Sequence, residues 1–227
     1  NISYPSDANL MTKLAEMAKK VMDFLKEKFP KIPKIANVDI KEIRKKARKY
    51  FFLAKNKSID VKREIFKDLH QAVKREMRKV IGYCQTLSES QIAQLPWNIK
   101  RSYDQVMNDG WRYLLDVAHF IRTQTIKPGK ILSLHIKNVK CIVKGKIGKE
   151  FEFGRVFQLG RIKGNFIFVL ESMSLEMNDK LSFIPLIEEH TRIFGEKALE
   201  TVAADKGYWS AKNRRELRQR GLPACGL

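Results

Sequence analysis

Residues 199–210 read LETVAADKGYWS, and this stretch decides the fold more than any other part of the chain. Small apolar residues lead up to Asp205, a pattern that predicts a buried strand ending in an acid. Gly207 follows and allows the chain to turn sharply. Because sites in open α/β sheets gather at the carboxyl ends of strands, Asp205 is well placed to hold a divalent cation. An Asp in such a place can equally form a turn or cap a helix.

The residues before this stretch predict a hairpin. The runs 151–163 and 165–175 are rich in β-forming residues and are separated by Lys163-Gly164-Asn165, a good signal for a tight turn. We therefore expect these runs to pair as an antiparallel hairpin. We also expect the strand that ends at Asp205 to lie in the same sheet.

Helices are expected on both sides of that strand. One runs from Asp179 to Phe194 and is ended by Gly195, although Pro185 inside it is awkward. The other follows Ser210 as its N-cap. The order hairpin, helix, strand, helix predicts an α/β fold with a mixed, partly parallel sheet covered by helices.

Upstream of Pro128-Gly129, apolar residues recur at three- and four-residue steps, which predicts helices. Asp39 has the place of an N-cap before one of them. Basic residues crowd the outer faces of these helices over 41–49 and 62–79. Such a surface is either the solvated face of a helical bundle or a face that contacts DNA.

The charge balance favours a polyanionic partner. The chain has 227 residues, with 45 Lys and Arg against 25 acidic residues and a formal net charge of +20. Nucleic acid is the first candidate, because Lys and Arg release counterions when they neutralise phosphates. An anionic membrane surface, ribosomal RNA and an ordinary basic surface are the alternatives. No apolar run approaches the ~20 residues that span a bilayer, so we expect no membrane insertion.

The cysteines indicate the redox state of the cellular compartment in which the chain is found. Cys84, Cys141 and Cys225 are odd in number and widely spaced. This arrangement favours free thiols in a reducing cytosol over disulfides or a zinc site.

The second half of the chain resembles the catalytic core of insertion-sequence transposases of the DDE type, which have an RNase H-like fold. The specific match is the segment from Ala203 to Ser210, with Asn213 and Leu217 behind it. Supporting matches lie at 144–154, at 179–190, and in the first seven residues, NISYPSD. The helical middle matches only by its position, as an insertion.

The resemblance implies the organisation of the chain. Residues 1–36 would follow the first catalytic strand, 37–128 would form a basic, mainly helical insertion subdomain, and 129–227 would form part of the RNase H-like core. In this family the first catalytic Asp lies upstream of the segment that residues 1–7 resemble. The final Glu lies beyond the segment that 217–227 resemble. We therefore expect a fragment in which Asp205 alone represents the triad and which is inactive by itself.

The chemistry explains why a single acid is not enough. Two divalent ions, Mg²⁺ or Mn²⁺, must be held about 4 Å apart for in-line phosphoryl transfer. Carboxylates from separate elements must converge, because one Asp cannot fix two octahedral ions. Asp205 is accordingly predicted to be both catalytic and a metal ligand in the full-length parent.

Several side chains are candidates for contacts with DNA phosphates. Their alternatives are an exposed hairpin tip and the exposed face of a helix. The candidates are Lys144, Lys146, Lys149, Lys212, Arg214, Arg215 and Arg218.

The aromatic residues and His190 are expected to be mainly structural. Trp97, Trp111 and most Phe are predicted to be in the core, and His190 is predicted to be structural. Trp209, beside Asp205, is either a core residue or a contact to a base or sugar.

The resemblance implies a piece of a DNA transposase that cleaves and joins the ends of a mobile element. We expect double-stranded DNA as its partner, a homo-oligomer in the complete enzyme, and a cytoplasmic, nucleoid-associated location. The alternatives are a non-catalytic basic nucleic-acid-binding protein and a nuclease of the same fold.

Overall fold

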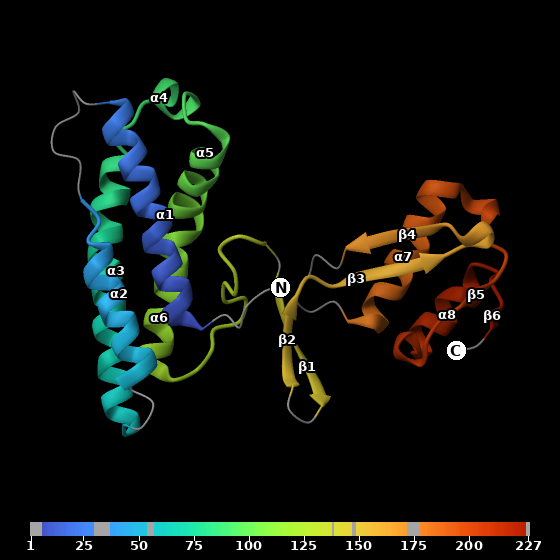
Figure 1. Cartoon of the computed structure of the whole chain (residues 1–227). Helices are drawn as coiled ribbons and strands as arrows, with labels where there is room; N and C mark the ends of the chain where they lie inside the picture. The colour runs from blue at the N-terminus through green and yellow to red at the C-terminus, as the bar shows by residue number, and fades with distance from the viewer. Residues whose placement is uncertain are drawn as a thin grey trace. The chain divides into compact units, whose positions relative to one another are not determined.

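The computed structural model describes residues 6–29, 37–53, 57–137, 139–146, 149–171 and 178–225, and only the backbone of 143–146, 149–151, 171 and 224–225. The chain forms two compact units, residues 1–137 and 138–227 (Figure 1). Within the described residues, no helix is long and apolar enough to cross a bilayer.

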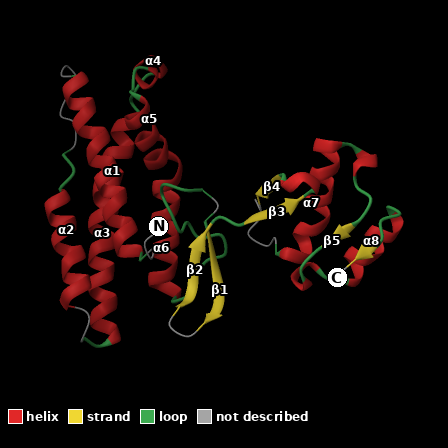
Figure 2. Cartoon of the chain, turned by 45° about the vertical axis from the view of Figure 1, so that its right-hand side comes forward, coloured by secondary structure: helices red, strands yellow, loops and turns green. Residues whose placement is uncertain are grey.

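The first unit is a bundle of helices, and its described residues contain no strand (Figure 2). The helices are α1 (Asp7–Lys28), α2 (Ile40–Arg48), α3 (Ile59–Cys84), α4 (Glu89–Ala93), α5 (Trp97–Asp104) and α6 (Trp111–Thr123). Two π-helical turns extend them: Lys49–Leu53 follows α2, and Gln105–Gly110 joins α5 to α6.

The apolar repeat of the sequence forms the core of this bundle. Helix α1 packs against α2, α3 and α5, and its residues Leu14 and Val21 are fully buried. Asp39 caps α2 as expected, since its side chain accepts a hydrogen bond from the Glu42 amide at 2.9 Å. A Cβ added to Gly110 would lie 3.0 Å from side-chain atoms of Leu14 and Met77, so even alanine at this position would require these side chains to shift.

The boundary between the units lies after Lys137, and not at Pro128-Gly129 as the sequence predicts. Long-range contacts hold the intervening segment to the bundle. Leu134 is buried in the helical core, and the Lys130 Nζ lies 2.6 Å from the Asp7 Oδ2. Helix α1 belongs to the same core as the later helices, so 1–36 and 37–128 are not separate units here. Whether 37–128 is an insertion in the parent protein stays a prediction.

The second unit combines helices and strands, as expected for a mixed α/β fold. Its strands form three two-stranded sheets in the described residues. The antiparallel pairs are β1 (Lys140–Lys146) with β2 (Lys149–Gly154) and β3 (Phe157–Arg161) with β4 (Ile167–Glu171), and the parallel pair is β5 (Val202–Ala203) with β6 (Ala224–Cys225).

The predicted hairpin exists over a shorter range than the sequence indicates. Phe157–Arg161 pairs with Ile167–Glu171 around a turn in which Gly164 has φ 83° and Asn165 has φ 63°. Residues 151–154 belong to β2 and pair with β1 instead. The prediction that the strand before Asp205 shares the hairpin's sheet is wrong, because β5 is only two residues long and bonds to β6.

Helices α7 (Asp179–Phe194) and α8 (Ala211–Gln219) form the small core of this unit. Phe183, Ile187 and Leu217 are buried together. The Asn213 side-chain amide donates to the Lys180 and Tyr208 carbonyls at 2.8 Å each, which fastens α8 and the turn before it to the start of α7. Pro185 is accommodated inside α7, and Ser210 caps α8 as predicted.

Candidate functional site

Asp205 lies just past the end of β5, where the sequence places it. It precedes the short helical turn Lys206–Tyr208 but makes no side-chain capping hydrogen bond to it. Its side chain is exposed and has no hydrogen-bond or ion-pair partner in the part of the chain that the structure describes. The turn is closed by backbone atoms, with the Tyr208 amide donating to the Asp205 carbonyl at 2.9 Å. The carboxylate is therefore available for a ligand.

A second carboxylate, Asp179, belongs to the same site. The Gln158 amide donates to the Asp179 Oδ1 at 3.3 Å, and the Tyr208 hydroxyl donates to the Gln158 Oε1. A Cβ added to Gly207 would lie 2.8 Å from the Asp179 Oδ2, so Asp179 touches the backbone of the turn that follows Asp205. Sequence reasoning missed Asp179, because an acid in the first turn of a helix is also favoured by the helix dipole.

The electrostatics of Tyr208 report the proximity of both acids. Burial raises the pKa of Tyr208, and the charges of Asp179 and Asp205 raise it further. Tyr208 therefore stays a hydroxyl at neutral pH and serves as a hydrogen-bond donor to Gln158, whose side chain is almost completely buried.

A groove of about 400 Å³ runs between β3 and β5, with Asp205 among its lining residues. Leu159 comes from β3 and Val202 from β5, while Phe183 and Ile187 of α7 also line the groove. In the described residues, β3 bonds only to β4, and β5 bonds only to β6. The strands that face the groove thus each have one open edge.

His190 also lines this groove and fits the expected structural role. Its ring contacts those of Phe168 and Phe194, with centroid distances of 5.5 and 4.8 Å. Burial lowers the pKa of His190 below its ordinary value, which favours the neutral ring.

The described residues do not form a complete metal centre by themselves. No group of three or more His, Cys, Asp or Glu side chains is close enough to hold an ion in this part of the chain. The carboxylates of Asp205 and Asp179 are the hard oxygen donors that Mg²⁺ and Mn²⁺ prefer. Two carboxylates are fewer than the ligands that such an ion needs, so a complete centre would require donors beyond these two.

The structure describes the side chains of some basic residues that the sequence predicts to contact DNA, but not of others. Lys212, Arg214, Arg215 and Arg218 are exposed on α8 and have no ion-pair partner among the described residues. The side chains of Lys144, Lys146 and Lys149 lie outside the described residues, and only the backbone of the β1–β2 hairpin places them.

The basic surface of the helical unit is partly neutralised. Lys46 contacts Asp68 at 2.6 Å, and Arg44 contacts Glu16 at 2.8 Å. Arg75 and Lys79 contact Glu76 at 3.0 and 2.9 Å. Burial alone would raise the pKa of Glu76, but the hydrogen bonds from Lys79, Arg75 and the Asp39 amide lower it below its ordinary value.

The remaining cations of α2, with the first residue of the π-helical turn that follows it, form a stripe. Lys41, Lys45, Arg48 and Lys49 are exposed and have no acidic partner in the described part of the chain. At 100° per residue they fall on one side of the helix, turned away from the buried positions Ile40, Ile43 and Ala47. We call these four cations the α2 stripe.

One of the tryptophans departs from its expected core position. Trp97 is 76% exposed, so the prediction of a core role for it is wrong. Trp209, for which a core role and a contact to a base were both left open, is 46% exposed. Trp97 is the first residue of α5 after Pro96, and the buried face of that helix begins only at Ile99. Several Phe are exposed as well, including Phe52 and Phe166, against the prediction that most are in the core. Trp111 packs against the core as predicted.

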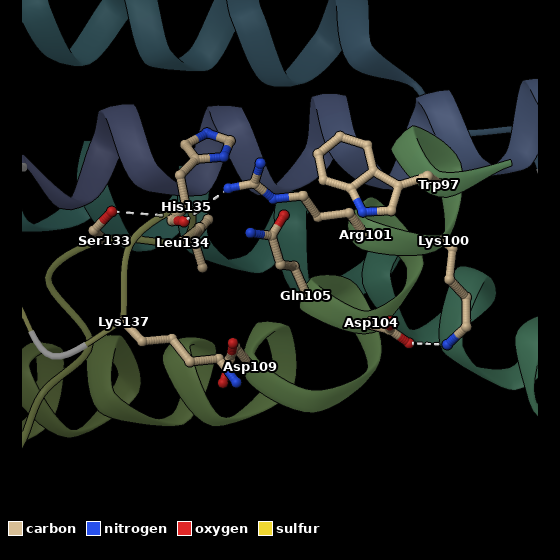
Figure 3. A pocket seen from close by; sticks show the side chains of 10 residues that line it. All are labelled: Trp97, Lys100, Arg101, Asp104, Gln105, Asp109, Ser133, Leu134, His135 and Lys137. Carbon is tan, nitrogen blue, oxygen red and sulfur yellow. Dashed lines mark hydrogen bonds and ion pairs between the residues drawn. The ribbon is translucent and has the colours of Figure 1, made fainter.

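Trp97 borders a second pocket, of about 320 Å³, in the helical unit (Figure 3). Its walls come from α5, the π-helical turn Gln105–Gly110 and residues 133–137. Burial and the nearby cations Lys13 and Arg101 lower the pKa of His135 at its edge.

The chain matches no known protein family, and neither a curated protein nor a solved structure is similar to it.

Proposed function

We propose that this chain is part of a DNA transposase of the DDE type and that Asp205 is one of its metal ligands. The observation that carries the proposal is that the Asp205 carboxylate is exposed and caps no helix or turn. A capping or turn-forming Asp places its side-chain oxygen on backbone N–H groups. The side chain of Asp205 makes no such bond, is exposed, and lies close to Tyr208, as Asp179 also does.

We further propose that the fold is RNase H-like and that a further strand occupies the groove between β3 and β5. Open strand edges are ready templates for another strand. The apolar lining of the groove, including Phe183 and Ile187, suits a strand that is buried on its faces. Such a strand would join β4, β3, β5 and β6 into one sheet.

The position of that strand supports the catalytic assignment. In the transposases that the chain resembles, the first catalytic Asp lies on a strand upstream of the segment similar to residues 1–7. Carboxyl ends of parallel strands meet at one edge of a sheet. A strand in the groove parallel to β5 would therefore bring that Asp beside Asp205.

The residues around Asp205 would then bind and orient the substrate. Divalent ions in such a site supply positive charge that stabilises the attacking and leaving oxygens of a phosphodiester. Asp205 would hold such an ion, with Asp179 fixed against Gly207 as a neighbouring oxygen donor. The exposed cations of α8 would bind the DNA backbone beside the reacting phosphate.

Duplex DNA is the proposed partner, held mainly through phosphate contacts. The α2 stripe supplies cations that no acid neutralises among the described residues. Binding of this kind is largely independent of sequence and weakens steeply with salt. We propose a homo-oligomer in the complete transposase and a cytoplasmic, nucleoid-associated location, because its substrate would be chromosomal and element DNA.

Metal binding tests the assignment of Asp205 on the chain as it stands. Mn²⁺ titrated into isotope-labelled protein should broaden the amide NMR signals of residues 202–208. The Asp205→Asn variant should lose this broadening, while Asp23→Asn, which alters an exposed acid in the other unit, should keep it. Broadening that persists in Asp205→Asn would overturn the metal assignment.

Strand cleavage tests the activity. The assay uses element-end DNA with Mg²⁺ or Mn²⁺ and compares the chain, a version lengthened at both ends by its flanking codons, and the lengthened Asp205→Ala variant. Missing ligands should lower the rate at least ~1,000-fold, so only the lengthened version with Asp205 should cleave. Full activity of lengthened Asp205→Ala would refute the catalytic role. DNA binding without cleavage by any version would favour the non-catalytic binding protein.

A further inference from the structure

The indole of Trp97 is exposed at the surface of the helical unit. It is 76% exposed, although a Trp side chain is one of the largest apolar groups a protein can bury. The Arg101 guanidinium lies over this ring, 5.6 Å from its centroid. Arg101 is in turn held by a hydrogen bond of 3.1 Å to the His135 carbonyl. The ring and the cation are thus held together at the surface.

The pocket beside Trp97 offers both hydrogen-bonding groups and positive charge. Gln105 and Asp109 lie on the π-helical turn Gln105–Gly110, and Figure 3 shows Gln105 beneath Arg101 and Asp109 beside the end of the Lys137 side chain. Along the edge of a planar heterocycle, an amide can donate and accept hydrogen bonds, and a carboxylate can accept them. π-Helical turns inside α-helices are frequent at functional sites. Here the turn brings Gln105 and Asp109 to the pocket, while its residues Val106 and Gly110 are buried.

The charged side chains of the pocket indicate which kind of planar ligand would bind there. Lys100, Arg101 and Lys137 line the pocket, and Lys20 lies close by, since its Nζ is 3.4 Å from the Asn98 carbonyl. Among the described residues Lys100 is paired with Asp104, whereas Lys137 has no acidic partner. A heterocycle attached to an anionic chain matches this combination. A volume of about 320 Å³ is in the range of pockets that take small organic groups.

We propose that this pocket binds one unpaired base of a DNA strand, with the base stacked on Trp97 and the neighbouring phosphates on Arg101 and Lys137. The inference rests on the proposed nucleic-acid function, and it adds a second mode of contact to it. Duplex DNA would be held through phosphates by the α2 stripe, and an unpaired nucleotide would be held through its base. Base–aromatic stacking tolerates any base, because every base has a π-face.

The test follows the fluorescence of Trp97 during titration with oligothymidylate. The chain contains three Trp, so the Trp97 signal is taken as the difference between the wild-type protein and Trp97→Phe. Oligothymidylate should quench this signal. An abasic oligonucleotide of the same length, which carries the phosphates without bases, should quench it far less. Thymidine monophosphate serves as a probe for the nucleotide without the strand and should quench only at much higher concentration.

Affinity provides the second readout. Trp97→Ala should weaken binding to oligothymidylate about 5- to 150-fold, which corresponds to the ~1–3 kcal/mol of one stacked base. Binding to a duplex should be unchanged, because the cations of the α2 stripe are not altered. Trp97 is exposed, so the variant should keep the far-UV circular dichroism of the wild type.

The outcomes separate this inference from the function on which it rests. Equal quenching by the abasic strand, or equal affinity of Trp97→Ala for oligothymidylate, would overturn the stacking site while salt-dependent duplex binding remained. Failure of the wild-type chain to bind either single-stranded or duplex DNA would overturn both.

Discussion

Removal of the α2 stripe should change the salt dependence of DNA binding by a calculable amount. The change is a quadruple replacement of Lys41, Lys45, Arg48 and Lys49 by Ala. These side chains are exposed and lack acidic partners in the described residues, so each is free to neutralise one phosphate. Each contact contributes about −0.9 to the slope of log K against log salt, hence about −3.6 for the stripe.

The same slope gives the expected difference in affinity. Between ~50 and ~200 mM salt, the wild-type affinity should fall roughly 150-fold more than that of the stripe variant. Fluorescence anisotropy with a labelled duplex measures both curves. The loss should be the same for duplexes of unrelated sequence, because phosphate contacts carry no sequence information.

The matched control removes the same charge from ion-paired positions. It replaces Lys19, Arg44, Arg63 and Lys67 by Ala, each of which contacts an acid on the same unit. Its slope should change by much less than that of the stripe variant. If both variants lose the same slope, binding follows total charge, and the reasoning that assigns a defined contact surface to α2 is refuted.

Three further predictions concern the helical unit. Tyr113→Phe should lower its free energy of unfolding by about 1.5–3 kcal/mol in urea titrations, because the hydroxyl donates to the Asp7 carbonyl at 2.9 Å and to its carboxylate at 3.1 Å; a loss below ~0.5 kcal/mol would contradict this. Burial raises the pKa of Cys84 to about 12, so a thiol reagent at pH 8 should label the exposed Cys141 and reach Cys84 only after unfolding. Burial lowers the pKa of His70 in the folded state, so its contribution to stability is complete above the unfolded pKa of ~6.5 and is lost as pH falls below it; urea unfolding between pH 8 and 5 should show this loss, and His70→Gln should reduce it.

Local signals predicted the elements of the fold well. Helical periodicity identified the buried side of α1, and Asp39 and Ser210 cap helices as their neighbours in sequence indicate. These features depend on residues within one or two turns of each other. The hairpin turn at Gly164 was likewise visible, because a positive φ favours Gly.

Features that depend on distant residues were missed. The boundary after Lys137 depends on a contact between Lys130 and Asp7, which the sequence does not reveal. The neutralisation of Lys46 depends in the same way on Asp68 from another helix. In the candidate site, the place of Asp205 just after a strand was predicted because its strand pattern is local, and its catalytic role stays a prediction. Asp179 was missed because only folding brings it to Gly207.

The ion pair between Asp7 and Lys130 also has a consequence for how readily the bundle can change in size. It joins the first turn of α1 to the segment that follows α6, so the bundle starts and finishes at one place. A module whose ends meet can be inserted into a host fold, lengthened, shortened or exchanged with little displacement of the chain on either side. The bundle can therefore be lengthened or shortened while β1 and the elements after it keep their geometry.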